Sequence, residues 1–247
     1  MAAVTLLSTR GLSRAFGGIS AVDGVDFDLP AGEIRAIIGP NGAGKTTFVG
    51  LVCGRVAPSV GRVVFDGEDI TGLPAHRRVG RGIAYTFQIT SVFGKLSAFD
   101  NVALAVQSSM QRRARAWRPL DSGELTARAV EALGRVGLAE RAGMKAAELP
   151  YGHQRILEVA MGVALMPKLL ILDEPTQGLS DSEIENFCGL IRAIAAAATV
   201  LLIEHNMDVV MQLAHRITVM SQGRILAEGA PAEIGANQAV QQAYLGA

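Results

Sequence analysis

The stretch GPNGAGKTT, residues 39 to 47, decides how the rest of the chain is interpreted. It follows an apolar run, Ile34 to Ile38, that predicts a buried strand, and it leads into a helix predicted to start near Gly44. The stretch fills every position of the phosphate-loop pattern between Gly39 and Thr46. Its glycines allow a tight turn that points amide hydrogens inward, and the following helix presents its positive end to an anion. A phosphate-binding loop is therefore predicted, rather than a glycine-rich turn that happens to precede a helix.

Within the loop, Lys45 would neutralise the β and γ phosphate oxygens. Four further side chains, described below, would complete a nucleotide site. The hydroxyl of Thr46 can bind Mg²⁺, a hard cation that prefers oxygen ligands. Asp173 ends the apolar stretch LLILD, and Glu174 follows it directly. The natural division gives Asp173 the Mg²⁺ shell and makes Glu174 the general base for the attacking water. His205 follows another apolar strand candidate, which favours a γ-phosphate contact over a purely structural histidine.

Composition limits the class of protein. The chain has 247 residues, 49% of them hydrophobic, and a formal net charge of zero, which suits one large domain or one domain with a subdomain. A neutral chain gives no electrostatic reason to expect nucleic acid as a partner. Cys53 and Cys188 form no metal-ligand spacing or disulfide framework. The N-terminus lacks the pattern of a signal peptide, so a cytoplasmic location is expected.

The order of apolar segments predicts an α/β fold. From Leu6 to Leu29 we expect short strands around a turn at Gly17 and Gly18, followed by a hairpin-like stretch, GRVVFDGEDI. Residues 96–149 predict an inserted helical subdomain, and its basic patch QRRARAWRP predicts a solvated helix end or loop rather than a lipid or nucleic-acid contact. A helix after Gly152, the strand LLILD, a helix around Ile184–Ala198 and the strand TVLLIEH then alternate. This alternation predicts a largely parallel sheet, covered on both faces, with ligands at the carboxyl ends of its strands.

The longest apolar run, from Ala193 to Ile203, is too short to cross a bilayer, which requires roughly 20 residues. Any connection to a membrane must therefore come through a partner.

Six motifs in chain order give the sequence a resemblance to the ATP-binding subunits of ABC transporters over nearly its full length. They are the phosphate loop, Gln88 in TFQ, LPYGHQR at 149–155, LLILDEP, GLSDSE and His205. The resemblance implies a P-loop NTPase of the ABC type, with a mainly parallel core sheet, an antiparallel β subdomain and an inserted α-helical subdomain. It implies one domain over residues 1–247, with the helical subdomain at about 89–165 and a C-terminal tail helix at about 230–247.

The resemblance also assigns roles to individual residues. Gln88 matches the Q-loop residue, which approaches Mg²⁺ and the water and follows contact with the membrane subunit; otherwise it is a polar residue at a strand end. Phe16 matches the aromatic that stacks on adenine, whereas an isolated Phe would be read as core. The implied catalytic set is Glu174, His205 and Gln88, and the implied metal set is Thr46, Gln88 and Asp173. The residues expected to contact ATP are Phe16, Gly39, Pro40, Asn41, Gly42, Ala43, Gly44, Lys45, Thr46, Thr47, Tyr151, Gly152 and His153.

The stretch LPYGHQR departs from the usual LSGGQ signature of the family. Pro150, Tyr151 and His153 stand in place of the serine, the first glycine and the glutamine. In the family, this signature closes over the γ-phosphate that the other subunit binds. Pro150 has neither a hydroxyl nor an amide hydrogen, so Gly152 and the following helix end are expected to carry more of that contact, aided by Tyr151 or His153. Downstream, Ser180 stands where many relatives carry aspartate, and Asp181 follows it.

Three further stretches resemble the branched-chain amino acid importer branch. They span residues 72–88, 204–234 and 240–246. The implied protein is the ATPase motor of an importer, a dimer that sandwiches nucleotide and is attached through separate membrane subunits to the cytoplasmic face of the inner membrane. An external binding protein would deliver the substrate, and no nucleic acid would take part. Urea, short amides and aromatic acids remain alternative substrates. A soluble ABC-type ATPase acting on DNA, ribosomes or iron–sulfur assembly remains an alternative function, and a phosphate-loop kinase a more remote one.

Overall fold

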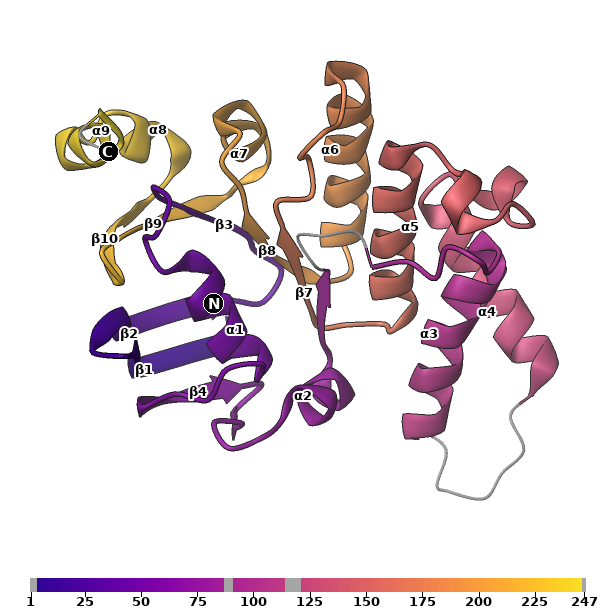
Figure 1. Ribbon diagram of the computed structural model, residues 1–247, viewed down its shortest axis with the longest axis horizontal. Coiled ribbons are helices and arrows are strands. Elements are labelled where there is room, and N and C mark those ends of the chain that lie inside the picture. The colour runs from indigo at the N-terminus through magenta and orange to yellow at the C-terminus, as the bar shows by residue number, and fades with distance from the viewer. Residues whose placement is uncertain (1–3, 87–90, 114–120, 246–247) are drawn as a thin grey trace.

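Two sheets form the framework of the computed structural model, which describes residues 4–86, 91–113 and 121–245 (Figure 1). The larger sheet has six strands in the order β10-β9-β3-β8-β7-β6. Its strands are β3 (Ile34–Ile38), β6 (Ile83–Thr86), β7 (Leu169–Asp173), β8 (Thr199–Ile203), β9 (Arg216–Ser221) and β10 (Arg224–Gly229). Every neighbouring pair is parallel except β9 with β10. The predicted mainly parallel core sheet is thus confirmed.

The central strands are apolar along their whole length because both faces of the sheet are covered. On β7, Leu169 and Ile171 belong to one core, and Leu170 and Leu172 belong to the other. Figure 1 shows the covering helices on opposite sides of the sheet. They are α1 (Lys45–Cys53) on one side and α5 (Tyr151–Ala164), α6 (Asp181–Ala195) and α7 (Met207–Leu213) on the other.

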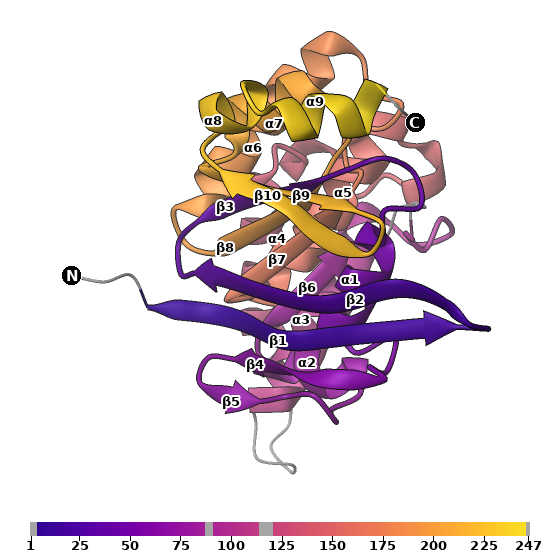
Figure 2. The same ribbon diagram turned by 90° about the vertical axis from the view of Figure 1, so that its left-hand side faces the viewer.

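The second sheet is antiparallel, with four strands in the order β2-β1-β4-β5. Its strands are β1 (Thr5–Phe16), β2 (Ile19–Pro30), β4 (Val60–Phe65) and β5 (Glu68–Asp69). The expectation of short strands at its start is wrong, because β1 and β2 have 12 residues each and run side by side (Figure 2). Their register shifts several times, for example between Thr9 and Leu12. Such bulges interrupt the alternation of apolar and polar residues, so one long strand resembles several short ones in the sequence.

The helices that follow β6 pack against α5 and form a third core. They are α3 (Ala98–Arg113), α4 (Ser122–Arg135) and the 3₁₀ turns η1 (Ala139–Arg141) and η2 (Ala146–Glu148). The apolar side chains of Val102, Leu133 and Leu157, one from each of the three α-helices, are fully buried in this core. The described parts of residues 96–149 are therefore mainly helical, as predicted, while the subdomain limits of about 89 and 165 stay a prediction. Among the described residues, none of the helices has the length and apolar content needed to cross a bilayer.

Three features of the helices differ from what the sequence pattern predicted. Helix α6 begins at Asp181, three residues before the expected Ile184, because the Glu183 carboxylate accepts hydrogen bonds from the amide and hydroxyl of Ser180. The C-terminal segment holds two helices, α8 (Pro231–Gly235) and α9 (Gln238–Leu245). The Asn237 side chain accepts from the amides of Ala239 and Val240, which starts α9 anew. Helix α2 (Ala75–Arg81), before β6, has no counterpart in the sequence prediction.

Candidate nucleotide-binding site

The loop between β3 and α1 can be built only with glycine at two of its positions. Gly39 and Gly44 have φ angles of 152° and 97°. A Cβ on Gly39 would lie 2.1 Å from the carbonyl oxygen of Met220, and a Cβ on Gly44 would lie 2.3 Å from that of Ala21. Gly44 is also the N-cap residue of α1, so the first amides of this helix face the loop without a side chain over them. The predicted phosphate loop therefore has the geometry of an anion cradle.

Lys45, the first residue of α1, folds back over this loop. Its Nζ donates to the carbonyl oxygens of Gly39 at 2.6 Å and Pro40 at 3.0 Å. Partial burial lowers the pKa of Lys45, and the negative charges of Glu174 and Asp173 oppose that shift. The ammonium group is thus held among backbone acceptors and near two carboxylates, where it can exchange its carbonyl partners for phosphate oxygens.

Asp173 and Glu174 stand where β7 ends, at the carboxyl edge of the parallel sheet. Asp173 is 2% exposed, and burial raises its pKa, while a hydrogen bond from Tyr85 lowers it. Glu174 adopts a φ of 47°, a left-handed conformation that costs about 1–3 kcal/mol in a residue other than glycine. Its amide donates to the carbonyl oxygen of Ile203 at 2.9 Å, so the turn is pinned to the end of β8. The two adjacent carboxylates have different neighbours, Tyr85 for Asp173 and His205 for Glu174.

His205 lies beside Glu174, as expected from their two strand ends. Its Nδ1 is 3.9 Å from Oε1 of Glu174 and 3.9 Å from Oε2 of Glu204, and its side chain is 60% exposed. Glu204 was missed in the sequence, although it is a carboxylate between an apolar strand and a histidine. Its buried side chain accepts from the amides of Thr176, His205 and Asn206 at 3.1, 2.9 and 3.1 Å. Glu204 therefore ties the end of β8 to the segment that follows Glu174.

Strand β2 passes beside the phosphate loop. The amide of Asp23 donates to the carbonyl of Gly223, whose own amide donates to the carbonyl of Ala43, at 2.9 and 3.0 Å. Phe16, at the end of β1, is 46% exposed, and the Arg14 guanidinium lies 4.7 Å from its ring centroid. This exposure excludes Phe16 from the core, while stacking on adenine stays a prediction.

The signature residues form a second cluster around the start of α6. Pro150 is the N-cap of α5, and Tyr151 begins the helix with 45% of its surface exposed. A Cβ on Gly152 would lie 2.3 Å from Oε1 of Glu183, and His153 is paired with Arg141. Within the described residues, no hydrogen bond or ion pair joins this cluster to residues 39–47. In the described part of the chain, the signature residues and the phosphate loop thus form two clusters without a polar contact between them.

Two sequence predictions fall wholly or partly outside the described residues. Gln88 falls in residues 87–90, and the basic stretch 112–118 extends into residues 114–120, both outside the described residues.

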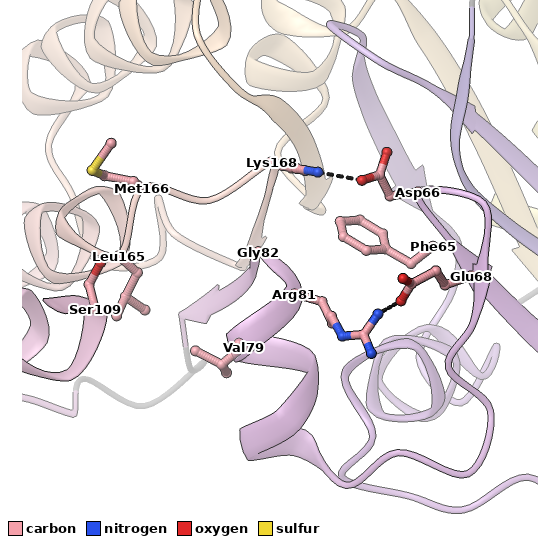
Figure 3. Close-up of a pocket in the computed structure, with 11 residues that line it drawn as sticks. Phe65, Asp66, Glu68, Val79, Arg81, Gly82, Ser109, Leu165, Met166 and Lys168 are labelled. Atoms are coloured by element: carbon pink, nitrogen blue, oxygen red, sulfur yellow. Dashed lines mark hydrogen bonds and ion pairs between the residues drawn. The ribbon is translucent and has the colours of Figure 1, made fainter. Parts of the chain in front are cut away.

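A separate cavity of about 370 Å³, drawn in Figure 3, lies at the amino ends of strands β6 and β7. Its lining residues Gly82 and Lys168 come immediately before β6 and β7, whereas nucleotides bind beyond the carboxyl ends of parallel strands. Its charged side chains are already paired, Lys168 with Asp66 and Arg81 with Glu68. This cavity is therefore not the nucleotide site.

The loop geometry and the paired carboxylates agree with a comparison to known families, in which a family model described as "ABC transporter" matches residues 22–177. The chain belongs to the ABC transporter family. A second family model, described as "Branched-chain amino acid ATP-binding cassette transporter", matches residues 224–247 of this ABC protein. The predicted family is thereby confirmed, and with it an ATPase activity coupled to transport.

Relatives and solved structures cover nearly all of the ABC chain. It is 37% identical to the "High-affinity branched-chain amino acid transport ATP-binding protein BraF" of Pseudomonas aeruginosa, over 98% of each chain. It is also 37% identical to the protein LivG of Escherichia coli, described in the same words, over 98% of each chain. A crystal structure of an ATP-binding cassette of an ABC transporter in its ADP conformation superposes with a TM-score of 0.87 at 26% identity, covering 99% of this chain and 100% of that one. The predicted P-loop NTPase fold of the ABC type is confirmed.

Proposed function

We propose that the chain is the ATPase motor subunit of an importer for branched-chain amino acids. One observation carries the proposal: a phosphate loop and an Asp–Glu pair meet at one sheet edge, in a chain that matches BraF and LivG over 98% of its length. The names of these relatives and the match of residues 224–247 support the substrate class. The motor would lie at the cytoplasmic face of the inner membrane, held there by separate membrane subunits.

The residues at the sheet edge fit Mg²⁺ bound together with ATP. Magnesium usually keeps several waters and takes one or two protein oxygens besides the phosphates. Thr46 and Asp173 offer that small oxygen set, and Gln88 is proposed as a further ligand by resemblance. Among the described residues no group of three or more His, Cys, Asp or Glu side chains could hold a metal by itself. This donor set suits an ion that arrives with its nucleotide, and the bound ion would neutralise charge that develops on the phosphates.

In the proposed reaction, each side chain has a separate task. The loop amides and Lys45 hold the β and γ phosphates. Glu174 accepts a hydrogen bond from the attacking water and polarises it toward the γ-phosphate. His205, 3.9 Å from Glu174, contacts the γ-phosphate and fixes the direction of attack. The turn at Ile203 and Glu204 keeps these two side chains at the end of neighbouring strands.

The separation of the two clusters supports a nucleotide-sandwich dimer. A second ATP-binding subunit, the same chain or a homologous one, would bring its α5 N-terminus over the γ-phosphate bound here. Pro150 supplies no donor, so the amides of the first turn of α5, beginning with those of Tyr151 and Gly152, would make this contact. Tyr151 has the exposure required, while a contact from His153 would require its pairing with Arg141 to open. ATP binding would then close the pair, and hydrolysis would reopen it.

The membrane subunit has a suitable contact surface at the end of β6. A cavity of about 310 Å³ is lined by Tyr85 and Thr86 on one side and by α3 and α5 on the other. Exposed apolar side chains surround it, with Phe93 at 55% and Leu104 at 41% exposure. We propose that a helix of the membrane subunit docks here. The motor itself would touch no transported substrate, which an external binding protein would deliver.

The proposal is tested by purifying the chain with its membrane subunits and measuring uptake in proteoliposomes supplied with the binding protein. ATP-dependent uptake of leucine, isoleucine and valine, abolished by Glu174→Gln, is the expected result. Uptake restricted to urea, short amides or aromatic acids would overturn the substrate class. An ATPase that is fully active and partnered in the soluble fraction, with no membrane subunit attached, would overturn the transport role.

A further inference from the structure

Tyr85 links β6 to the carboxyl end of β7. The two strands are parallel, and Tyr85 is paired with Ile171. Side chains two residues apart on a strand point to the same face, so Asp173 lies on the face that Ile171 and Tyr85 share. The hydroxyl of Tyr85 can therefore reach past Ile171 to Asp173, the next residue on that face of β7. This hydroxyl donates a hydrogen bond to Oδ2 of Asp173 at 2.7 Å.

The ring of Tyr85 is itself held from the side of α1. The guanidinium carbon of Arg55 lies 4.7 Å from the centroid of the Tyr85 ring. Arg55 follows Gly54, the left-handed C-cap of α1, and its amide donates to the carbonyl of Gly50 at 2.9 Å. The helix that begins at Lys45 thus ends two residues before Arg55, which covers the Tyr85 ring. The support of Asp173 is built on the same helix as the phosphate loop.

This bond matters because Asp173 is buried to 2% exposure, so water has little part in orienting its carboxylate. An ionised carboxylate has about four acceptor positions, and one bond to Oδ2 still leaves positions for a metal or its bound water. The tyrosine hydroxyl has one hydrogen to donate, and the Asp173 carboxylate oxygen accepts it. The geometry is that of a hydrogen-bond donor behind a metal ligand, where such donors fix the ligand's orientation.

We propose that Tyr85 is a positioning residue for the ATPase reaction: its hydroxyl holds Asp173 in the orientation that binds Mg²⁺, and Arg55 holds the Tyr85 ring. The inference rests on the proposed function, in which Asp173 belongs to the magnesium shell. Tyr85 acts through Asp173 and does not touch the reacting atoms.

The test uses Tyr85→Phe, which keeps the ring and removes the hydroxyl. The affinity for the non-hydrolysable analogue AMP-PNP is measured in EDTA and in Mg²⁺, and the ratio gives the gain due to the metal. That gain should fall about 10-fold in Tyr85→Phe, while the affinity in EDTA stays at the wild-type value. Turnover should recover toward the wild-type kcat at saturating Mg²⁺. Arg55→Met should show a smaller loss in the same direction.

A matched control removes a buried hydroxyl elsewhere. Thr9 lies in the antiparallel sheet, and its Oγ1 donates to the carbonyl of Val25 at 2.9 Å. Thr9→Val should keep the full magnesium gain. Because Tyr85 acts through Asp173, Tyr85→Phe should add no further loss in an Asp173→Asn background.

Three results would overturn the inference. They are an unchanged magnesium gain in Tyr85→Phe, an equal loss of AMP-PNP affinity in EDTA, and an additive loss in the double variant. If Asp173→Asn alone kept the full magnesium gain, Asp173 would not belong to the magnesium shell. That result would overturn both the proposed role of Asp173 and this inference. A normal loss in Asp173→Asn with no effect of Tyr85→Phe would overturn only the inference.

Discussion

The Nδ1 atom of His205 lies 3.9 Å from Oε1 of Glu174, and the two side chains come from the ends of adjacent parallel strands. The pairing of Asp173 with Ile203 sets this neighbourhood, because Glu174 is the next residue after Asp173 and His205 is the second residue after Ile203. The distance leaves space for a γ-phosphate oxygen or a water to contact both groups. Glu174 and His205 therefore act as one unit in the proposed hydrolysis.

We expect His205→Ala to lower the ATPase kcat by about 10²-fold or more, because the γ-phosphate and water lose one of their two orienting groups. ATP affinity should change little, since the loop and Lys45 carry the binding. Steady-state hydrolysis and equilibrium nucleotide binding check the two halves of this prediction. A variant with wild-type kcat would remove His205 from the reaction.

Lys45→Ala should weaken nucleotide binding itself, by about 10- to 100-fold, because one charge-assisted contact to the phosphates is lost. Titration with a fluorescent ATP analogue measures the effect. Lys168→Ala is the matched control, since Lys168 is an exposed lysine paired with Asp66 at the other edge of the sheet. Equal affinities for wild type and Lys45→Ala would contradict the phosphate-loop assignment.

Gly44→Ala should destabilise the fold by about 1–3 kcal/mol, since a left-handed φ of 97° and a Cβ only 2.3 Å from the Ala21 carbonyl oxygen are both unfavourable. Gly189→Ala provides the control, because Gly189 lies within α6 and a Cβ there meets nothing within 4 Å. That substitution should stabilise the protein by about 0.5–1 kcal/mol. Urea denaturation of both variants measures these changes in the free energy of unfolding. A Gly44→Ala protein as stable as wild type would show that the loop tolerates a side chain.

His153 should make stability depend on pH. Burial, together with the positive charge of Arg141, lowers the pKa of His153 in the folded chain, and Glu183 opposes this shift. The unfolded chain therefore binds a proton at a higher pH than the folded chain. The stability from this group is present above the ordinary histidine pKa, about 6.5, and is lost as pH falls through the lower folded value. Denaturation at several pH values should show a weaker acid dependence in His153→Gln than in wild type, whereas parallel pH curves would contradict the prediction.

The sequence predicted the strands buried on both faces closely. The observed β3 coincides with the apolar run from Ile34 to Ile38, and β7 coincides with LLILD, because central parallel strands are continuous apolar segments between polar turns. Helix α2 was missed, since it has seven residues and no apolar periodicity. Its Arg78 is buried at 1% exposure and donates to the backbone carbonyls of Leu51 and Val52, a role that only tertiary packing creates.

The candidate site likewise contains residues that the sequence predicted and contacts that it could not predict. The phosphate-loop pattern located Lys45, and the ends of two predicted strands located Asp173, Glu174 and His205. The contact from Tyr85 to Asp173 could not be predicted, since it depends on the register between strands separated by more than 80 residues. The pairing of signature residues with the start of α6 likewise depends on how two distant helices pack.

The central claim is that one chain holds ATP on its phosphate loop and a second chain completes the site through the start of its α5. Analytical ultracentrifugation of Glu174→Gln, with and without Mg-ATP, tests it most directly. We expect a monomer without nucleotide and a stable dimer retaining ATP when hydrolysis is blocked. A protein that binds Mg-ATP fully and remains monomeric at every concentration would contradict the account.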